Sequence, residues 1–319
     1  MTPIRFSRRR FLAGLAMAPF ALQAACSSPG SADDDFAEKV GLASTETAPS
    51  PTPTPEPPFV VAEGEERRLL MAGTAQETPL YIFSSGRPGP VLMVLGGVHG
   101  NEPGGWLAAD RLLNILRPAD GAFLIIPRAN LQADAAFVRT TPELGDLNRL
   151  YPGDPGGLPM ARMADQITQT AREFHVTHFV DMHESWAFYN GRGQNGTAFL
   201  GQTIATDPSG SGMDLVRSVV QAVNSRILYA HEEMFYRERG GNANNQPNQG
   251  FNGNVAPSNQ GSGNPGGSGT SSLSVTRHVP GLAAALLVEM GQQQGLERRI
   301  ALHVDVAREV ARHIGLIPA

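Results

Sequence analysis

The chain has 319 residues, of which 41% are hydrophobic and 17% are charged, and its formal net charge is −5. This length and composition fit one large domain or two small ones with a packed core, and they exclude general disorder. The acidic balance, with no broad basic patch in the sequence, argues against a nucleic-acid partner. The single cysteine, Cys26, excludes an internal disulfide framework and a cysteine-based zinc cluster.

The first 25 residues have the pattern of an export signal. SRRRFL at residues 7–12 carries a twin arginine, and the apolar stretch over residues 11–22 is too short to span a bilayer. The segment resembles a twin-arginine signal peptide, and LQAAC, which ends at Cys26, resembles a lipobox. We therefore expect an exported protein that is anchored through lipidated Cys26 at the extracytoplasmic face of the cell membrane.

Residues 26–58 are rich in Pro, Ser and Thr and end in PSPTPTPEPP. Alternating prolines favour extended polyproline II and cannot pack a core, so we interpret this segment as a linker or stalk. It precedes a catalytic domain that we expect at residues 59–319.

Apolar segments alternate with helical patterns from residue 59 onward. The expected strands are residues 80–84, 91–98, 122–127, 178–183, 197–203, 227–231 and 283–290, and the expected helices are residues 104–116, 159–174, 213–226 and 297–314. Continuous apolar strands between helices predict an α/β domain with a mixed, largely parallel central sheet and helices on both faces. Functional sites in such domains gather at the carboxyl ends of the strands.

Residues 240–274 differ from the rest of this domain. They consist of Asn, Gln, Gly and Ser with scattered Pro and carry no charge, so they cannot form a core. We expect a disordered polar insert between two core strands, which acts either as an active-site lid or as a neutral expansion.

Three apolar strands end in residues that bind metals or protons. GGVHGNEPGG places His99 and Glu102 after one strand, HFVDMHES places His183 on a second, and AAALLVEMG places Glu289 on a third. A carboxylate in such a strand costs several kcal/mol unless it is paired, protonated or bound to a metal.

His99, Glu102 and His183 would form a His2Glu ligand set for one zinc ion, with His99 on the last residue of its strand and Glu102 at the start of a helix. Glu289 would then be the general base that takes a proton from the zinc-bound water, with a pKa raised by its apolar surroundings. HxxE alone is a weak signal, because lone histidines usually belong to the core or the surface. His175, His178, His278, His303 and His313 are assigned to those roles.

A fourth segment, residues 126–153, contains Arg139 and the run DLNRLYPG and makes the pattern specific. Taken in order, VHGNE, DLNRLYPG, VDMHES and LLVEMG resemble the succinylglutamate desuccinylase/aspartoacylase family, within the zinc carboxypeptidase A-like group, over about residues 75 to 315. The resemblance implies zinc ligands at His99, Glu102 and His183 and a general base at Glu289.

The resemblance also implies residues that bind and orient the substrate. Asn148 and Arg149 would bind a free carboxylate, which suits the planar fork of arginine, and Arg139 would polarise the scissile carbonyl. Asp146 would orient His99, and Asp181 is a weaker candidate for a similar role. Tyr236 is the nearest candidate for the substrate-binding tyrosine of carboxypeptidases, followed by Tyr229.

The implied reaction is hydrolysis of an amide bond next to a free carboxylate, in a peptide, a cell-wall peptide or an N-acyl amino acid. Thirty residues follow Glu289 (319 − 289), which favours a bare carboxypeptidase-like domain over one with the additional β-rich domain of aspartoacylases. The alternatives are a surface lipoprotein that binds a peptide or ligand without catalysis and, with little support, a serine hydrolase, because neither GSG segment forms GxSxG.

Overall fold

The computed structural model describes residues 58–189, 199–207, 212–238, 255–256 and 271–318, which fall within one compact unit. The expected signal peptide, Cys26, nearly all of the linker and most of the polar insert lie outside these residues. Within the described ranges, no helix is long and apolar enough to cross a bilayer.

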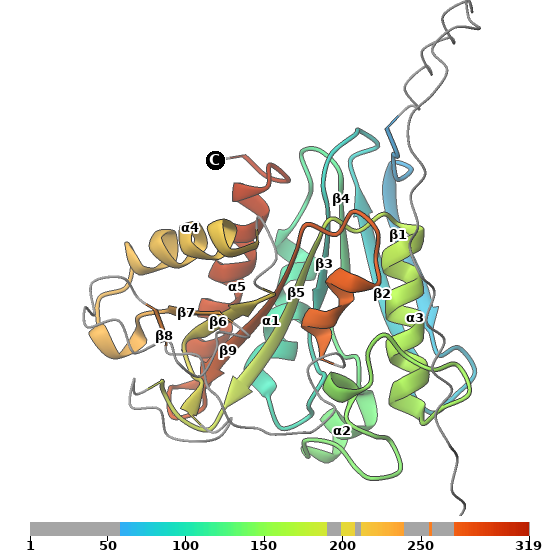
Figure 1. Ribbon diagram of the computed structural model, residues 1–319, viewed down its shortest axis with the longest axis horizontal. Helices are drawn as coiled ribbons and strands as arrows, with labels where there is room; N and C mark the ends of the chain where they lie inside the picture. The colour runs from blue at the N-terminus through green and yellow to red at the C-terminus, as the bar shows by residue number, and fades with distance from the viewer. Residues whose placement is uncertain (1–57, 190–198, 208–211, 239–254, 257–270, 319) are drawn as a thin grey trace, which may run out of the picture. The chain divides into compact units, whose positions relative to one another are not determined.

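The described residues form a nine-stranded sheet and five α-helices, arranged as in Figure 1. The strands are β1 (Gly64–Leu70), β2 (Thr78–Ser84), β3 (Val91–Leu95), β4 (Ala122–Ile126), β5 (His178–Ser185), β6 (Thr203–Thr206), β7 (Phe235–Glu238), β8 (Val255–Ala256) and β9 (Ala284–Gly291). The helices are α1 (Pro103–Ile115), α2 (Leu131–Ala136), α3 (Pro159–Glu173), α4 (Gly212–Asn224) and α5 (Leu296–His313). Short 3-10 helices span Leu147–Arg149 (η1), Ala230–Glu232 (η3) and Ser272–Arg277 (η5).

The sheet is mixed and largely parallel, as expected. Its strand order is β1-β2-β4-β3-β5-β9-β6-β7-β8. The central strands β4, β3, β5 and β9 pair in parallel, and β6, β7 and β8 are also parallel to one another, whereas β6 runs antiparallel to β9. The carboxyl ends of β3, β5 and β9 therefore lie side by side at one edge of the sheet.

Alternate residues of the central strands face two separate cores. On β3, Met93 and Leu95 pack with α3 and η5, whereas Leu92 and Val94 pack with α1, α4 and α5. Successive strand side chains point to opposite faces, so an unbroken apolar run such as VLMVL requires cover on both sides.

Two expected strands are wrong in position. The segment expected at 227–231 contains no strand, and β7 begins only at Phe235. Leu228 is 86% and Tyr229 61% exposed, whereas Ile227 packs partly against the core. The amide of Asn224 bonds the backbone of Met234 and closes a turn there. The strand expected at 197–203 instead spans Thr203–Thr206 as β6.

Two other segments differ from the sequence interpretation. β1 was not expected, because its sequence GEERRLL is mostly charged and solvent-exposed, which is typical of an edge strand. The last residues of the expected polar insert, 272–274, are buried in η5 rather than forming part of a loop.

Helix α1 offers a test of the core, because its inner and outer positions can be compared on one element. Leu112 is fully buried, whereas Ile115 is 48% exposed. We expect Leu112→Ala to lower the free energy of unfolding by about 2–5 kcal/mol through cavity formation. Ile115→Ala should change it by about 0.5 kcal/mol or less, as measured by urea denaturation. Equal losses in the two variants would contradict the assigned orientation of α1.

Candidate active site

The segment GGVHGNE forms the turn between β3 and α1. β3 ends at Leu95, so His99 lies in the turn beyond the strand rather than on its last residue as expected. Gly97 adopts a positive φ of 65°, which glycine allows at little cost, and its carbonyl accepts the backbone N–H of Asn130 at 2.7 Å. Glu102 directly precedes the first residue of α1.

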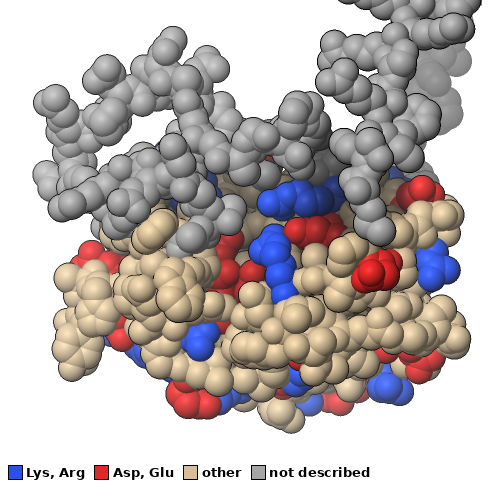
Figure 2. Space-filling view, turned by 90° about the horizontal axis from the view of Figure 1, so that it is seen from below, with Lys and Arg blue, Asp and Glu red and all other residues tan. Residues whose placement is uncertain are grey.

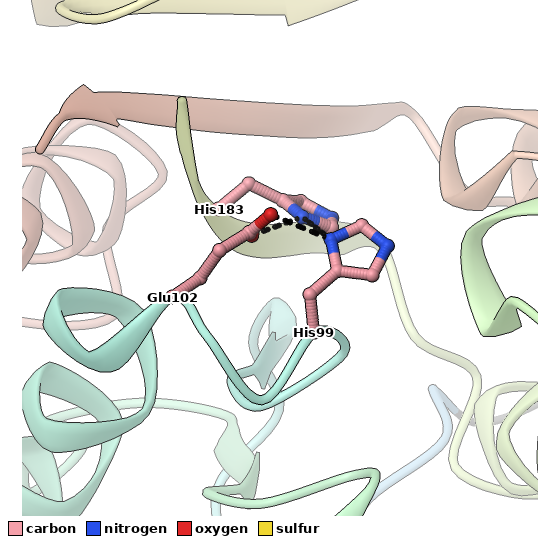
Figure 3. Close-up of side chains that lie close together, drawn as sticks. All are labelled: His99, Glu102 and His183. Atoms are coloured by element: carbon pink, nitrogen blue, oxygen red, sulfur yellow. Dashed lines mark hydrogen bonds and ion pairs between the residues drawn. The ribbon is translucent and has the colours of Figure 1, made fainter. Parts of the chain in front are cut away.

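The turn brings His99 and Glu102 against His183 of β5 (Figure 3). His99 Nδ1 lies 2.8 Å from Glu102 Oε1, and His183 Nδ1 lies 2.9 Å from Glu102 Oε2. The two Nδ1 atoms are 3.1 Å apart, and all three side chains are buried. Ligands of one tetrahedral zinc lie roughly 3.3–3.6 Å apart, which is close to these separations.

The opposite ring nitrogens of both histidines contact carboxylates. His99 Nε2 lies 3.1 Å from Asp146 Oδ1, and His183 Nε2 lies 2.8 Å from Asp181 Oδ2. A carboxylate in this position holds the proton on Nε2 and leaves Nδ1 as an electron-pair donor, as in metal-bound histidines. The donor set and its supports therefore fit a divalent metal.

Charge complementarity holds the Glu102 carboxylate in the ionised state. Burial by itself raises the pKa of Glu102, but the charges and hydrogen bonds of His99 and His183 outweigh it and hold the pKa far below its usual value. Burial lowers the pKa of His183, yet Asp181 and Glu102 raise it well above its usual value. Negative charge thus accumulates around the two imidazoles, which favours a bound cation.

Glu289 lies beside this cluster because of the strand register. His183 of β5 pairs with Glu289 of β9, which pairs with Thr203 of β6, so the three side chains share one face of the sheet. Glu289 is buried, and this burial raises its pKa to about 7. Such a carboxyl group can both accept and return a proton near neutral pH.

Arg139, Asn148 and Arg149 border the cluster on the side of η1. Arg139 donates to Asp146 Oδ2 at 3.1 Å and to Glu102 Oε1 at 3.5 Å. Asn148 Nδ2 lies 3.5 Å from His183 Nε2, and Arg149 donates to the Asn148 carbonyl at 2.7 Å. Arginine and acidic side chains also lie next to one another in the middle of the face shown in Figure 2.

The structure places Tyr236 away from these residues, which corrects its expected role. Its ring packs into the core under α4, with the guanidinium carbon of Arg217 5.5 Å from the ring centroid. Arg237 lies on the opposite face, where its Nε donates to Thr203 Oγ1 at 2.9 Å, next to Glu289. Sequence reasoning missed Arg237. In a strand of four residues, only the pairing with neighbouring strands shows which side chains face which side of the sheet. Tyr229 is exposed on the surface.

Solved structures confirm that the fold is of the zinc carboxypeptidase-like type. Csd4, the cell shape determinant of Helicobacter pylori, superimposes with a TM-score of 0.56 at 15% identity, covering 72% of this chain and 52% of that chain. A succinylglutamate desuccinylase/aspartoacylase of Rhodobacter sphaeroides superimposes with a TM-score of 0.54 at 20% identity, covering 81% of this chain and 68% of that chain.

Sequence comparison finds the same family over part of the chain. Residues 88–188 match the model of the succinylglutamate desuccinylase/aspartoacylase catalytic domain, which confirms the resemblance over that segment. N-alpha-acetyl-L-2,4-diaminobutyric acid deacetylase of Halomonas elongata is 38% identical over 94 residues, which are 28% of this chain and 27% of the deacetylase. The chain therefore matches only about a quarter of that relative's length.

The carboxylates behind the histidines can be tested by their effect on metal affinity. We expect Asp181→Asn to weaken the binding of one divalent ion by about 10–100-fold, because the amide no longer supports the Nε2 proton of His183. Competition with a chromophoric chelator measures the dissociation constant. Asp165→Asn, on α3 and away from the cluster, is the control. Unchanged affinity in Asp181→Asn would contradict the assigned support.

Proposed function

We propose that this protein is a zinc-dependent hydrolase that cleaves an amide bond next to a free carboxylate. One observation carries the proposal: the buried Glu102 carboxylate lies between two imidazole Nδ1 atoms whose other nitrogens are held by Asp146 and Asp181. This donor set suits zinc, which is commonly bound by histidine nitrogen and carboxylate oxygen in hydrolases.

His99, Glu102 and His183 would hold the ion, with one ion expected per chain. Zinc bound there would supply Lewis acidity, lowering the pKa of a water molecule to about 7 and polarising a carbonyl. Asp146 and Asp181 keep the two imidazole rings oriented.

Glu289 would act as the general base. It removes a proton from the attacking water and later delivers that proton to the leaving amine nitrogen, so its own charge is restored at the end of the cycle. Its pKa of about 7 suits both transfers. Arg139, which bridges Glu102 and Asp146, would stabilise negative charge that develops on the scissile carbonyl oxygen.

Arg149 and Asn148 would bind the free carboxylate of the substrate. Arginine forms two parallel hydrogen bonds to a carboxylate, which gives both affinity and orientation. The relatives support this substrate class: one is named as a deacetylase of an acetylated amino acid, and Csd4 is a D,L-carboxypeptidase with an mDAP-bound form. Peptides, cell-wall peptides and N-acyl amino acids are therefore the substrates to test.

The N-terminal sequence supports a location outside the cytoplasm. The twin arginine, the short apolar stretch and Cys26 together favour export and attachment by a lipid to the membrane. A tethered enzyme at that place meets peptides and wall fragments. Mass spectrometry of the mature N-terminus would contradict this part of the proposal if Cys26 carried no lipid.

Replacement of the base should separate catalysis from metal binding. We expect Glu289→Gln to lower kcat by about 10²–10⁴-fold, because the amide cannot accept a proton. Its zinc content, measured by plasma mass spectrometry, should equal that of the wild type. Glu297→Gln, which alters an exposed carboxylate on α5, should retain full activity. Full activity in Glu289→Gln, or in zinc-depleted wild type, would contradict the mechanism.

Arg149 should determine the requirement for a free carboxylate. We expect Arg149→Met to lower kcat/KM by about 10–100-fold on peptides and N-acyl amino acids with a free carboxylate. The reason is that the substrate carboxylate loses one charged hydrogen-bond partner. Amidated substrates, which lack that charge, should be affected little. Arg111→Met, which breaks an exposed ion pair on α1, is the control. Saturable binding without turnover across this panel would instead favour a non-catalytic binding protein.

A further inference from the structure

Helix α1 begins without a side-chain cap of its own. Glu102 occupies the capping position, but its side chain makes no capping hydrogen bond, because both oxygens face the two histidines. The first N–H groups of a helix need acceptors, and the partial positive charge at that end favours an anion. The helix also has no acidic residue in its first turn.

Glu184 of β5 supplies a buried carboxylate at this position. Its neighbour His183 faces the metal cluster, so Glu184 points to the other face of the sheet, towards α1 and α5. A methyl group at Gly104, the second residue of α1, would collide with Glu184 Oε1, so glycine permits this close approach. Glu184 Oε1 is buried against Gly104 and has no hydrogen-bond partner among the described residues, so its charge meets the positive end of α1 without a direct hydrogen bond.

Two further side chains hold Glu184 in place. Arg299 of α5 donates to Glu184 Oε2 at 2.5 Å, and both side chains are buried. Gln292, just after β9, donates to the Asn101 carbonyl at 2.6 Å and contacts Glu184 Oε2 at 3.5 Å. The cluster therefore joins three elements to the turn that immediately precedes Glu102.

Glu184 is also linked to Glu102 directly. Its backbone N–H donates to Glu102 Oε2 at 3.0 Å, on the oxygen that faces His183. Glu184 thus contacts the start of α1 through its side chain and the metal-facing carboxylate through its backbone. A shift of either contact would move Glu102 relative to both imidazoles.

We propose that Glu184, held by Arg299, is a positioning residue whose carboxylate caps α1 electrostatically from the neighbouring strand and so releases Glu102 to serve as a metal ligand. This inference rests on the proposed function for the role of Glu102, whereas the cap itself is a property of the metal-free chain. A purely stabilising ion pair would predict a change in stability alone.

The test replaces both members of the pair, so that no buried charge is left alone. Such replacements by apolar residues are often nearly neutral for stability. The variant is Glu184→Met with Arg299→Met. The matched control is Glu232→Met with Arg298→Met, which removes a 2.6 Å ion pair from the adjacent position of α5. Glu184→Gln retains a neutral acceptor and serves as the conservative variant.

Two quantities are measured on the full chain. Amide hydrogen exchange of residues 104–107 in metal-free protein reports on the cap, and chelator competition with zinc reports on the placement of Glu102. We expect the pair variant to accelerate exchange at least about tenfold and to weaken zinc binding about 10–100-fold, as for other supports of metal ligands. Glu184→Gln should lie between the wild type and the pair variant, and the control should match the wild type in both quantities.

The proposal is overturned if the pair variant and the control show the same exchange and the same zinc affinity. Should the pair variant fail to fold, Gln292→Met replaces it. This variant removes the contacts of Gln292 with Asn101 and Glu184 and should give smaller changes in the same direction. A wild-type chain that binds no zinc would refute the proposed function. The exchange measurement would still decide whether Glu184 caps α1.

Discussion

A buried carboxylate between two imidazoles is the constraint on which the rest of this domain depends. Glu102 is removed from water, so its charge requires compensation from every side. His99 and His183 provide most of it, and the Glu184 N–H and Arg139 contribute the remainder. These partners come from three segments, so the carboxylate joins the β3–α1 turn, β5 and the loop after α2.

The parallel centre of the sheet brings these segments together. Strands β3, β5 and β9 end at the same edge, and direct pairing sets His183 beside Glu289. The two faces of β5 then have different tasks. One face carries Asp181 and His183 towards the cluster, and the other carries Glu184 towards α1 and α5. Because successive side chains of a strand point to opposite faces, the proposed metal ligand His183 and the positioning residue Glu184 lie on opposite sides of the sheet.

Most of the central strands and helices were predictable from local sequence patterns. Buried parallel strands appear as continuous apolar runs, and amphipathic helices carry apolar residues about every 3.6 positions. The segments LLVEMG and VDMHES each place a polar residue, Glu289 and His183, near the end of an apolar strand. The structure pairs these two residues on neighbouring strands. Prediction was wrong where burial depends on distant partners. Leu228 and Tyr229 are hydrophobic but exposed, and β1 is charged but paired at an edge.

The sequence by itself determined the fold class and the spacing of His99, Glu102, His183 and Glu289, because these follow from local chemistry. Only the tertiary structure decided which side chains face one another. Tyr236 packs under α4, and Arg237 lies on the face of Glu289. Asp181 contacts His183 Nε2. It also joined Glu184 to Arg299, 115 residues later in the chain. Strand parity and long-range pairing are set by the packing of whole elements, which no short segment encodes.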